Sequence, residues 1–220
     1  MKSIIFDLDG TLLDSMPMWA DIDRRFLAEL GIEPPDGISE AIKAMTVPQA
    51  ADYMIRRFAL DLTPEQVTER VGMLAAKAYR EELPLKAGAE DFLREANRRG
   101  IPCALASITY PELLHAAVNR LGIAPYFQAV VTPEDGFSGK HDPAIYLHTA
   151  KLLHTAPAET LVCEDAFYAA KTAKDAGFPV LGILDPTAKA EWDRMRAICD
   201  RTAYDWTELL TAPFFQIFSE

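Results

Sequence analysis

The sequence is poor in basic residues, and this shortage limits the partners that the protein can have. Lysine and arginine together number 22, against 33 aspartates and glutamates, so the formal net charge is −11. Binding to nucleic acid or to anionic lipid needs clustered basic side chains. The composition therefore disfavours both partners and favours chemistry on a small molecule.

Long hydrophobic runs are also missing. No apolar stretch approaches the roughly 20 residues that a membrane-spanning helix needs. The first apolar run meets the acidic residue Asp7 too early for a signal peptide. We therefore expect a cytoplasmic protein without a membrane partner. A monomer or a weak dimer is expected as well.

Cysteine is scarce, and the chain has no internal repeats or low-complexity segments. Cys103, Cys163 and Cys199 are odd in number, far apart and set among apolar residues. This pattern is typical neither of a disulfide framework nor of a zinc site. It predicts three buried, reduced thiols without a chemical role.

The most informative segment that is present lies near the start of the chain. An apolar run at residues 3–6 leads directly into two carboxylates, Asp7 and Asp9. Residues two apart in a strand point to the same face, so this pair would repel itself without a cation. Gly10 permits a turn that separates the two side chains. Two interpretations stay open: solvated turn acids, or a nucleophile beside a general acid and base.

The 220 residues, half of them hydrophobic, suffice for one large core with a smaller inserted unit. After about residue 85, short apolar runs alternate with amphipathic stretches, which indicates a parallel sheet with crossover helices. We expect strands at residues 4–6, 103–106, 129–131, 161–163 and 180–183. Helices are expected at residues 89–99, 111–121, 143–153, 168–176 and 187–196. The fold class is thus α/β, with a doubly wound, Rossmann-like parallel sheet.

One region breaks this alternation. Residues 17–82 show only helical periodicity, and within them Thr63 and Pro64 have the pattern of an N-cap followed by a first helical residue. We therefore expect an inserted all-helical cap domain at residues 16–84. The α/β core is expected to combine residues 1–15 with residues 85–220.

Polar residues follow the other predicted strands at the points where each strand ends. Ser107 and Thr109 follow the second strand, Lys140 follows the third after a loop, and Glu164 and Asp165 follow the fourth. Ligands of open parallel sheets bind beyond these carboxyl ends. Each residue alone has an ordinary explanation, as a helix cap or a surface charge. Together they offer oxygen ligands for Mg²⁺ and donors for a phosphoryl group.

These motifs resemble those of the haloacid dehalogenase-like superfamily, in the branch whose helical cap follows the first core strand. That branch includes phosphoglycolate phosphatases and beta-phosphoglucomutases. The family pattern Asp-x-Asp-Gly-Thr is met at residues 7–11, its Ser or Thr at Ser107, its Lys at Lys140, and its acidic pair at Glu164 and Asp165. The resemblance covers nearly the whole chain.

The resemblance implies a division of labour between the two opening carboxylates. Asp7 would attack phosphorus to form an aspartyl-phosphate, and Asp9 would protonate the leaving oxygen and then activate water. Mg²⁺ would be held by Asp7, the backbone carbonyl of Asp9 and Asp165, with Glu164 nearby or bridged by water.

The resemblance also implies a phosphate-binding set, formed by Ser107, the amide of Ile108 and Lys140. The sequence departs from the family pattern at two places here. Ile108 replaces a small polar residue, so a side-chain contact is lost although its amide can still donate. His141 stands where proline is usual, and we interpret it as a solvent-facing loop residue.

Substrate choice is expected to reside in the helical cap, because a closing cap excludes water and contacts the leaving group. Candidate substrate-binding residues are Met16, Trp19, Lys43, Thr46 and Gln49. Trp19 also fits the apolar face of its own helix, and Lys43 also fits a solvated position.

In the family that these motifs resemble, the branches that cleave carbon–halogen or carbon–phosphorus bonds lack an Asp at this second position, because their leaving groups do not need this proton shuttle. The resemblance therefore implies that Asp9 favours phosphate esters. The predicted function is a Mg²⁺-dependent phosphatase acting on a small phosphorylated metabolite. Thr11 resembles the phosphatase form of the motif. A sugar phosphomutase of similar fold is the first alternative. A receiver-like signalling module is the second, although a receiver needs no cap.

Overall fold

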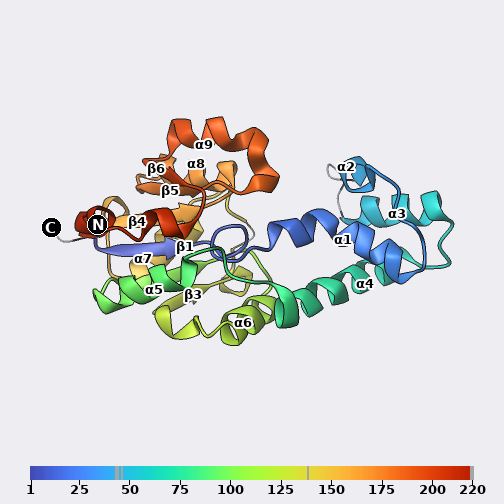
Figure 1. Cartoon of the computed structure of the whole chain (residues 1–220), viewed down its shortest axis with the longest axis horizontal. Helices are drawn as coiled ribbons and strands as arrows, with labels where there is room; N and C mark the ends of the chain where they lie inside the picture. Colours follow the sequence, from blue (N-terminus) through green and yellow to red (C-terminus); the bar gives the residue numbers. More distant parts are fainter. Residues whose placement is uncertain (43–44, 46, 138, 219–220) are drawn as a thin grey trace. The chain divides into compact units, whose positions relative to one another are not determined.

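The computed structural model describes residues 1–42, 45, 47–137 and 139–218. The chain divides into two compact units. One combines Met1–Met16 with Leu83–Glu220, and the other is Pro17–Glu82. In Figure 1 the second unit runs from blue to blue-green and contains helices without strands among its described residues.

The first unit is built on a six-stranded parallel sheet in the order β3-β2-β1-β4-β5-β6. The strands are β1 (Ser3–Phe6), β2 (Cys103–Ala106), β3 (Ala129–Val131), β4 (Thr160–Glu164), β5 (Val180–Ile183) and β6 (Arg201–Ala203). β1 lies between β2 and β4, with Ile4 opposite Cys103 on one side and Leu161 on the other. All four residues of β1 are buried, as expected of a central strand covered on both faces.

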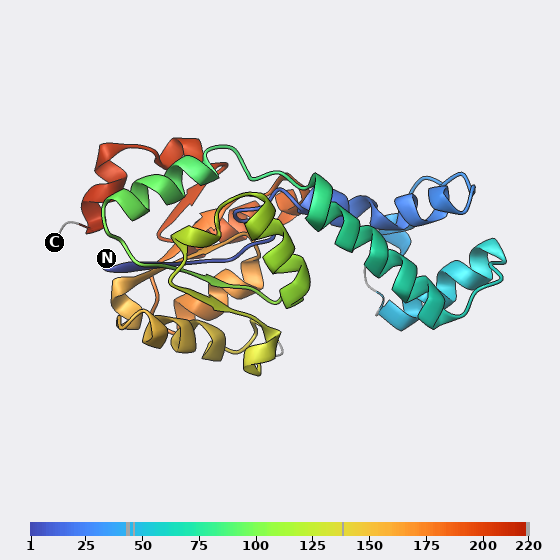
Figure 2. The same cartoon turned by 90° about the horizontal axis from the view of Figure 1, so that it is seen from below.

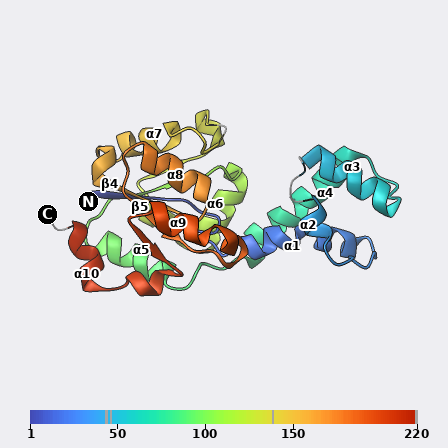
Figure 3. The same ribbon diagram turned by 90° about the horizontal axis from the view of Figure 1, so that it is seen from above.

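Helices cover both faces of this sheet. They are α5 (Ala89–Arg98), α6 (Pro111–Arg120), α7 (Ala144–Leu152), α8 (Phe167–Asp175), α9 (Trp192–Ile198) and α10 (Ala212–Phe215). Short helical turns lie at η2 (Ala124–Tyr126), η3 (Pro133–Asp135), η4 (Pro157–Glu159), η5 (Pro186–Glu191), η6 (Trp206–Leu209) and η7 (Gln216–Phe218). Figures 2 and 3 show α5 and α10 over one face and α7 over the other.

Neighbouring residues of β1 contribute to the two faces in turn, because successive side chains of a strand alternate. Ile5 packs in a core cluster with Ile145 of α7 and Ala170 of α8. Phe6 points the other way and packs edge to face on Phe92 of α5, with ring centroids 6.1 Å apart. The sheet therefore has a separate apolar layer on each face, and the polar residues are left to its edge.

The second unit has an apolar core of its own. Its helices are α1 (Met16–Glu29), α2 (Ile38–Ile42), α3 (Val47–Phe58), α4 (Pro64–Lys77) and the π-helical turn η1 (Ala78–Glu82). Phe26 and Met54 are buried together in this core. At the start of α4, the Gln66 amide donates to Thr63 Oγ1 at 3.3 Å, and the Gln66 side chain accepts from the Thr63 amide at 2.9 Å. This capping box confirms the predicted helix start.

The predicted fold class, a Rossmann-like core with an inserted helical cap, is confirmed, with two local differences. β6 was not predicted, because only Ala203 of its three residues is buried and the strand has no apolar run. The helix expected at residues 187–196 is divided into η5 and α9, since Ala188 has non-helical dihedral angles.

Over the described residues, every helix is too short or too polar to cross a membrane. All three cysteines are free; Cys103 and Cys163 are buried, whereas Cys199 is half-buried. Burial raises the pKa of the Cys103 thiol to about 12, which keeps it protonated and unreactive.

Candidate active site

The site begins at the carboxyl end of β1, directly after Phe6. The Asp7 amide donates to the Cys163 carbonyl at 3.0 Å, which continues the β1–β4 ladder by one residue and places Asp7 at the carboxyl edge. The chain then turns at Gly10, whose φ of +76° favours glycine. A Cβ at Gly10 would lie 2.1 Å from Asp165 Oδ2. Glycine is therefore needed both for the turn and for the close approach of Asp165.

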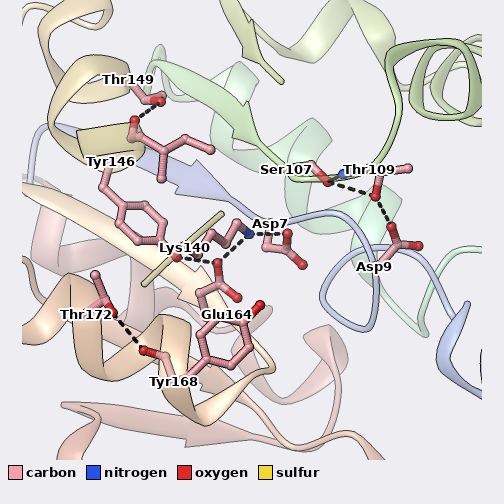
Figure 4. Close-up of polar contacts among 11 residues, drawn as sticks. Asp7, Asp9, Ser107, Thr109, Lys140, Tyr146, Thr149, Glu164, Tyr168 and Thr172 are labelled. Atoms are coloured by element: carbon pink, nitrogen blue, oxygen red, sulfur yellow. Dashed lines mark hydrogen bonds and ion pairs between the residues drawn. The ribbon is translucent and has the colours of Figure 1, made fainter. Parts of the chain in front are cut away.

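Lys140 lies between two of the predicted site carboxylates. Its Nζ donates to Asp7 Oδ1 and, at 2.6 Å, to Glu164 Oε1. Tyr146 of α7 donates from its hydroxyl to the same Glu164 oxygen at 2.7 Å. These four residues are each at most 6% exposed. Figure 4 shows the ammonium group between the two carboxylates, with Tyr146 approaching from α7.

The carboxylates of this cluster outnumber its cations. Burial raises the pKa of Asp7 to about 7; Lys140 lowers it, and the neighbouring Glu164 raises it further. The pKa of Asp165 is raised well above its usual value by burial and by the charges of Asp7 and Glu164. Burial by itself lowers the pKa of Lys140, but the charges of Asp7 and Glu164 reverse this effect and raise it.

The geometry fits a hard divalent cation. Asp7, Glu164 and Asp165 each offer one carboxylate oxygen, and these oxygens all lie within 4.8 Å of one another. Three buried carboxylates with a single lysine leave negative charge that a bound cation would neutralise. Carboxylate oxygens are the ligands that Mg²⁺ prefers. A buried acidic cluster suited to metal binding is thus present at the predicted place.

Asp9 belongs to a separate hydrogen-bond system. Thr109 donates from Oγ1 to Asp9 Oδ2, and Ser107 donates from Oγ to Thr109 Oγ1 at 3.0 Å. Figure 4 shows Asp9 beside Thr109 and apart from the Lys140 cluster. Ile108 lies between the two hydroxyl residues and is 43% exposed. The two opening carboxylates therefore have different surroundings: Asp7 is buried among charges, and the half-buried Asp9 accepts from a hydroxyl group.

Two further predicted residues lie beside the cluster. Met16 and His141 line a cavity of about 510 Å³ together with Asp165. His141 is exposed, as expected, and its ring stacks on Tyr168 with centroids 4.5 Å apart. Nothing in these contacts gives His141 a chemical role.

The remaining candidates belong to the helical unit. Trp19 is 37% exposed and donates from its indole nitrogen to the Tyr79 hydroxyl at 3.1 Å. Gln49 is exposed on α3. Lys43 and Thr46 lie outside the described residues. The assignment of substrate choice to this unit stays a prediction.

Sequence reasoning missed Tyr146, together with a buried ion pair at the end of β5. Lys86 Nζ lies 2.6 Å from Asp185 Oδ2 and 3.7 Å from Asp14 Oδ1. Burial tends to raise the pKa of Asp185, but hydrogen bonds from Lys86 and Thr187 lower it below its usual value. Asp185 is the second residue after the fifth predicted strand, so the rule that ligands bind beyond strand ends also applies to it. Tyr146 lies inside a helix and has no such signal.

The edge of the sheet thus presents a buried centre of three carboxylates and a lysine, at the place where open parallel sheets of α/β proteins bind their ligands. The sequence profile of the haloacid dehalogenase-like hydrolases matches residues 1–177, and the chain belongs to this family. Both the predicted family and the predicted enzyme class, a phosphoric monoester hydrolase, are confirmed.

Individual relatives agree with this result. Hexitol phosphatase A of Escherichia coli is 30% identical over 196 residues, which cover 84% of this chain and 84% of that protein. A phosphorylated carbohydrates phosphatase of Thermotoga maritima is 29% identical over 179 residues, which cover 80% and 82%. The structure of beta-phosphoglucomutase from Clostridium difficile shares the fold, with a TM-score of 0.69 at 18% identity, covering 100% of this chain and 97% of that one.

Proposed function

We propose that the protein is a Mg²⁺-dependent phosphatase that releases phosphate from a small phosphorylated metabolite through an aspartyl-phosphate on Asp7. The observation that carries this proposal is the contrast between the two carboxylates of the first loop. Asp7 is buried against Lys140, whereas Asp9 accepts a hydroxyl hydrogen bond outside that cluster. Two carboxylates in such different surroundings suit two different roles.

In the first half-reaction, an Asp7 oxygen attacks phosphorus while the bond from phosphorus to the leaving oxygen breaks. Asp9 gives its proton to that oxygen, so that an alcohol leaves rather than an alkoxide. Ser107, the Ile108 amide and Lys140 are proposed to hold the phosphoryl oxygens, because donors fixed in advance stabilise charge that develops there.

In the second half-reaction, water attacks phosphorus and Asp9, now ionised, takes its proton. The bond between phosphorus and the Asp7 oxygen breaks, which releases inorganic phosphate and restores both side chains. Asp7, Asp165 and the carbonyl of Asp9, with Glu164 nearby, are the residues that would hold Mg²⁺. When bound, the ion supplies positive charge that offsets the charge of the phosphoryl oxygens.

Phosphorylated sugars and polyols are the first substrate class to test, because the two relatives named above act on a hexitol phosphate and on phosphorylated carbohydrates by their names. A sugar phosphomutase is the second candidate, since beta-phosphoglucomutase shares the fold. It would need a bisphosphorylated activator and would exchange isomers without releasing phosphate. The receiver-like alternative is disfavoured by the match to a hydrolase family.

The proposed function predicts continuous turnover of p-nitrophenyl phosphate with Mg²⁺. We expect many phosphates released per protein molecule, and a fall of about a hundredfold in kcat for Asp9→Asn, because Asp9 also activates the water of the second half-reaction and general base catalysis contributes on this scale. The measurement is a colorimetric assay with parallel determination of free phosphate. A single stoichiometric phosphorylation without turnover would sink the phosphatase proposal. A screen of phosphorylated sugars, polyols, phosphoglycolate and nucleotides then identifies the substrate class.

Metal binding predicts a stability change that does not depend on turnover. Mg²⁺ at a hundred times its dissociation constant is expected to raise the free energy of unfolding by about 2.7 kcal/mol. Thermal unfolding with EDTA and with Mg²⁺ measures this shift. Asp165→Asn removes a proposed ligand and should lose it, whereas the matched control Asp175→Asn, an exposed position on α8, should keep it. If Mg²⁺ stabilises both variants equally, the ion does not bind at Asp165.

A further inference from the structure

Thr109 has a contact that the proposed roles do not use. It lies two residues after Ser107, in the loop between β2 and α6, and its hydroxyl reaches across to Asp9, a hundred positions earlier in the chain. The residue itself is half-buried. A hydroxyl group aimed at the proposed acid–base carboxylate can govern how that carboxylate works.

The hydrogen bonds in this loop have a direction. The Thr109 amide donates to Ser107 Oγ at 3.1 Å, Ser107 Oγ donates to Thr109 Oγ1 at 3.0 Å, and Thr109 Oγ1 donates to Asp9 Oδ2. A hydroxyl group has one proton to donate. Because Thr109 donates its hydroxyl proton to Asp9, Oδ2 of Asp9 acts as an acceptor.

This direction favours one Asp9 oxygen over the other as the carrier of a proton. An oxygen that accepts from Thr109 is disfavoured as the protonated oxygen of a carboxylic acid. The transferable proton is therefore left to Oδ1. The same bond restricts rotation of the carboxyl group about its last torsion, which is otherwise broad. Both effects favour delivery of the proton from one defined position.

We propose that Thr109 is a positioning residue for Asp9: its hydroxyl holds Oδ2 as an acceptor and thereby presents Oδ1 to the leaving-group oxygen. This inference rests on the proposed function, in which Asp9 is the general acid. It deepens that function by assigning proton delivery to a residue pair rather than to Asp9 alone.

The contact is compatible with the proposed role of Ser107. If Ser107 turns its hydroxyl proton to a phosphoryl oxygen, Thr109 loses a donor but keeps its own proton for Asp9. Holding the phosphoryl group and orienting the acid are therefore separable tasks on one loop. This separation makes the two residues distinguishable by experiment.

The experiment compares substrates that differ in their need for a proton. Wild type, Thr109→Val, Thr109→Ser and Ser107→Ala are assayed on p-nitrophenyl phosphate, phenyl phosphate and glycerol 2-phosphate. Their leaving groups range from a weakly basic nitrophenolate to a strongly basic alkoxide. The quantity compared is kcat/KM, which includes transfer to Asp7 but not the later hydrolysis. Thermal unfolding shows that each variant is folded.

We expect Thr109→Val to lower kcat/KM for glycerol 2-phosphate about tenfold and for p-nitrophenyl phosphate at most about twofold, since only the basic leaving group depends on the acid. Thr109→Ser keeps the donor and should restore the wild-type ratio. Ser107→Ala should lower kcat/KM for all three substrates by the same factor, because phosphoryl contacts do not depend on the leaving group.

A uniform loss in Thr109→Val, or no loss, overturns the inference while leaving the phosphatase proposal intact. Failure of the proposed function has a different signature: the wild-type protein then shows no continuous turnover of any of the three esters, and the inference fails with it. A selective loss on the basic leaving group that serine reverses supports the positioning role.

Discussion

Asp7→Asn is expected to lower turnover of phosphate monoesters by about 10⁴-fold or more, because loss of a covalent nucleophile removes the whole reaction path. The asparagine amide is nearly isosteric but cannot form the acyl phosphate. It also withdraws one of the three carboxylate oxygens grouped at the proposed metal site. Both effects act in the same direction on activity.

The same substitution should not weaken the fold, because Lys140 keeps its second partner, Glu164, and the cluster loses one of its surplus carboxylates. The pKa of Asp7 is raised to about 7, so at pH 8 the folded protein holds an ionised carboxylate that its surroundings disfavour. A carboxyl group whose pKa is raised by folding destabilises the folded state once the pH exceeds its unfolded value. Asparagine is neutral at every pH, so we expect the urea midpoint in EDTA at pH 8 to equal or exceed that of the wild type.

Opposite changes in activity and stability are the test, measured by phosphate release and by urea unfolding on the same preparation. Asp91→Asn is the matched control, since this exposed carboxylate on α5 pairs only with Arg94 at 2.9 Å among the contacts described here. It should change neither quantity appreciably. Substantial turnover in Asp7→Asn would exclude Asp7 as the nucleophile, and a large loss of stability would show that its charge stabilises the fold.

Much of the core could be predicted because its strands are short apolar runs in a sheet buried on both faces. β1, β2 and β5 are buried throughout, so their residues have the same character at every position. β6 has one buried residue and pairs along one side only, with β5. An edge strand of this kind depends on backbone pairing, which leaves no apolar pattern in the sequence.

The site could be predicted only in part, for a related reason. The rule that ligands bind beyond strand ends identifies residues by their place in the chain. It predicts that Asp7, Lys140, Glu164 and Asp165 lie near one another, and the structure places their side chains together. The rule does not predict which of these side chains form hydrogen bonds or ion pairs with one another.

The pairing of Thr109 with Asp9 shows this limit. Both residues follow predicted strands, but their contact depends on the path of the loop after β2 and on the turn at Gly10. Tyr146 reaches Glu164 from a helix interior, where its position reads as ordinary core packing. Loop paths and helix rotation are set by packing across the whole unit, which spacing along the chain does not encode.

Lys140→Met is expected to lower the free energy of unfolding in EDTA by about 3–5 kcal/mol, the usual result of removing one partner from a buried ion pair. Lys140 is 2% exposed and contacts both Asp7 and Glu164. Methionine fills similar volume but has no charge, so the change isolates electrostatics from packing. Three grouped carboxylates would then share a buried space without a cation among the contacts described.

Mg²⁺ should recover part of this loss, since a divalent ion supplies positive charge to the same carboxylates. The measurement is urea unfolding of wild type and Lys140→Met, each in EDTA and in saturating Mg²⁺, with Lys171→Met as the control. Lys171 is exposed and pairs with Asp175 at 2.5 Å on the surface of α8. Lys171→Met should lower the free energy of unfolding by less than about 1 kcal/mol.

The four conditions separate two explanations of a destabilised Lys140→Met. If lysine acts through its charge, the variant gains more from Mg²⁺ than the wild type does, because the ion relieves repulsion that Lys140 otherwise offsets. If lysine acts through packing of its long side chain, both proteins gain equally. A variant as stable as wild type in EDTA would mean that the carboxylates take up protons when the lysine is removed, as the raised pKa values of Asp7 and Asp165 permit. In that case the stability difference should appear as the pH rises and these groups ionise.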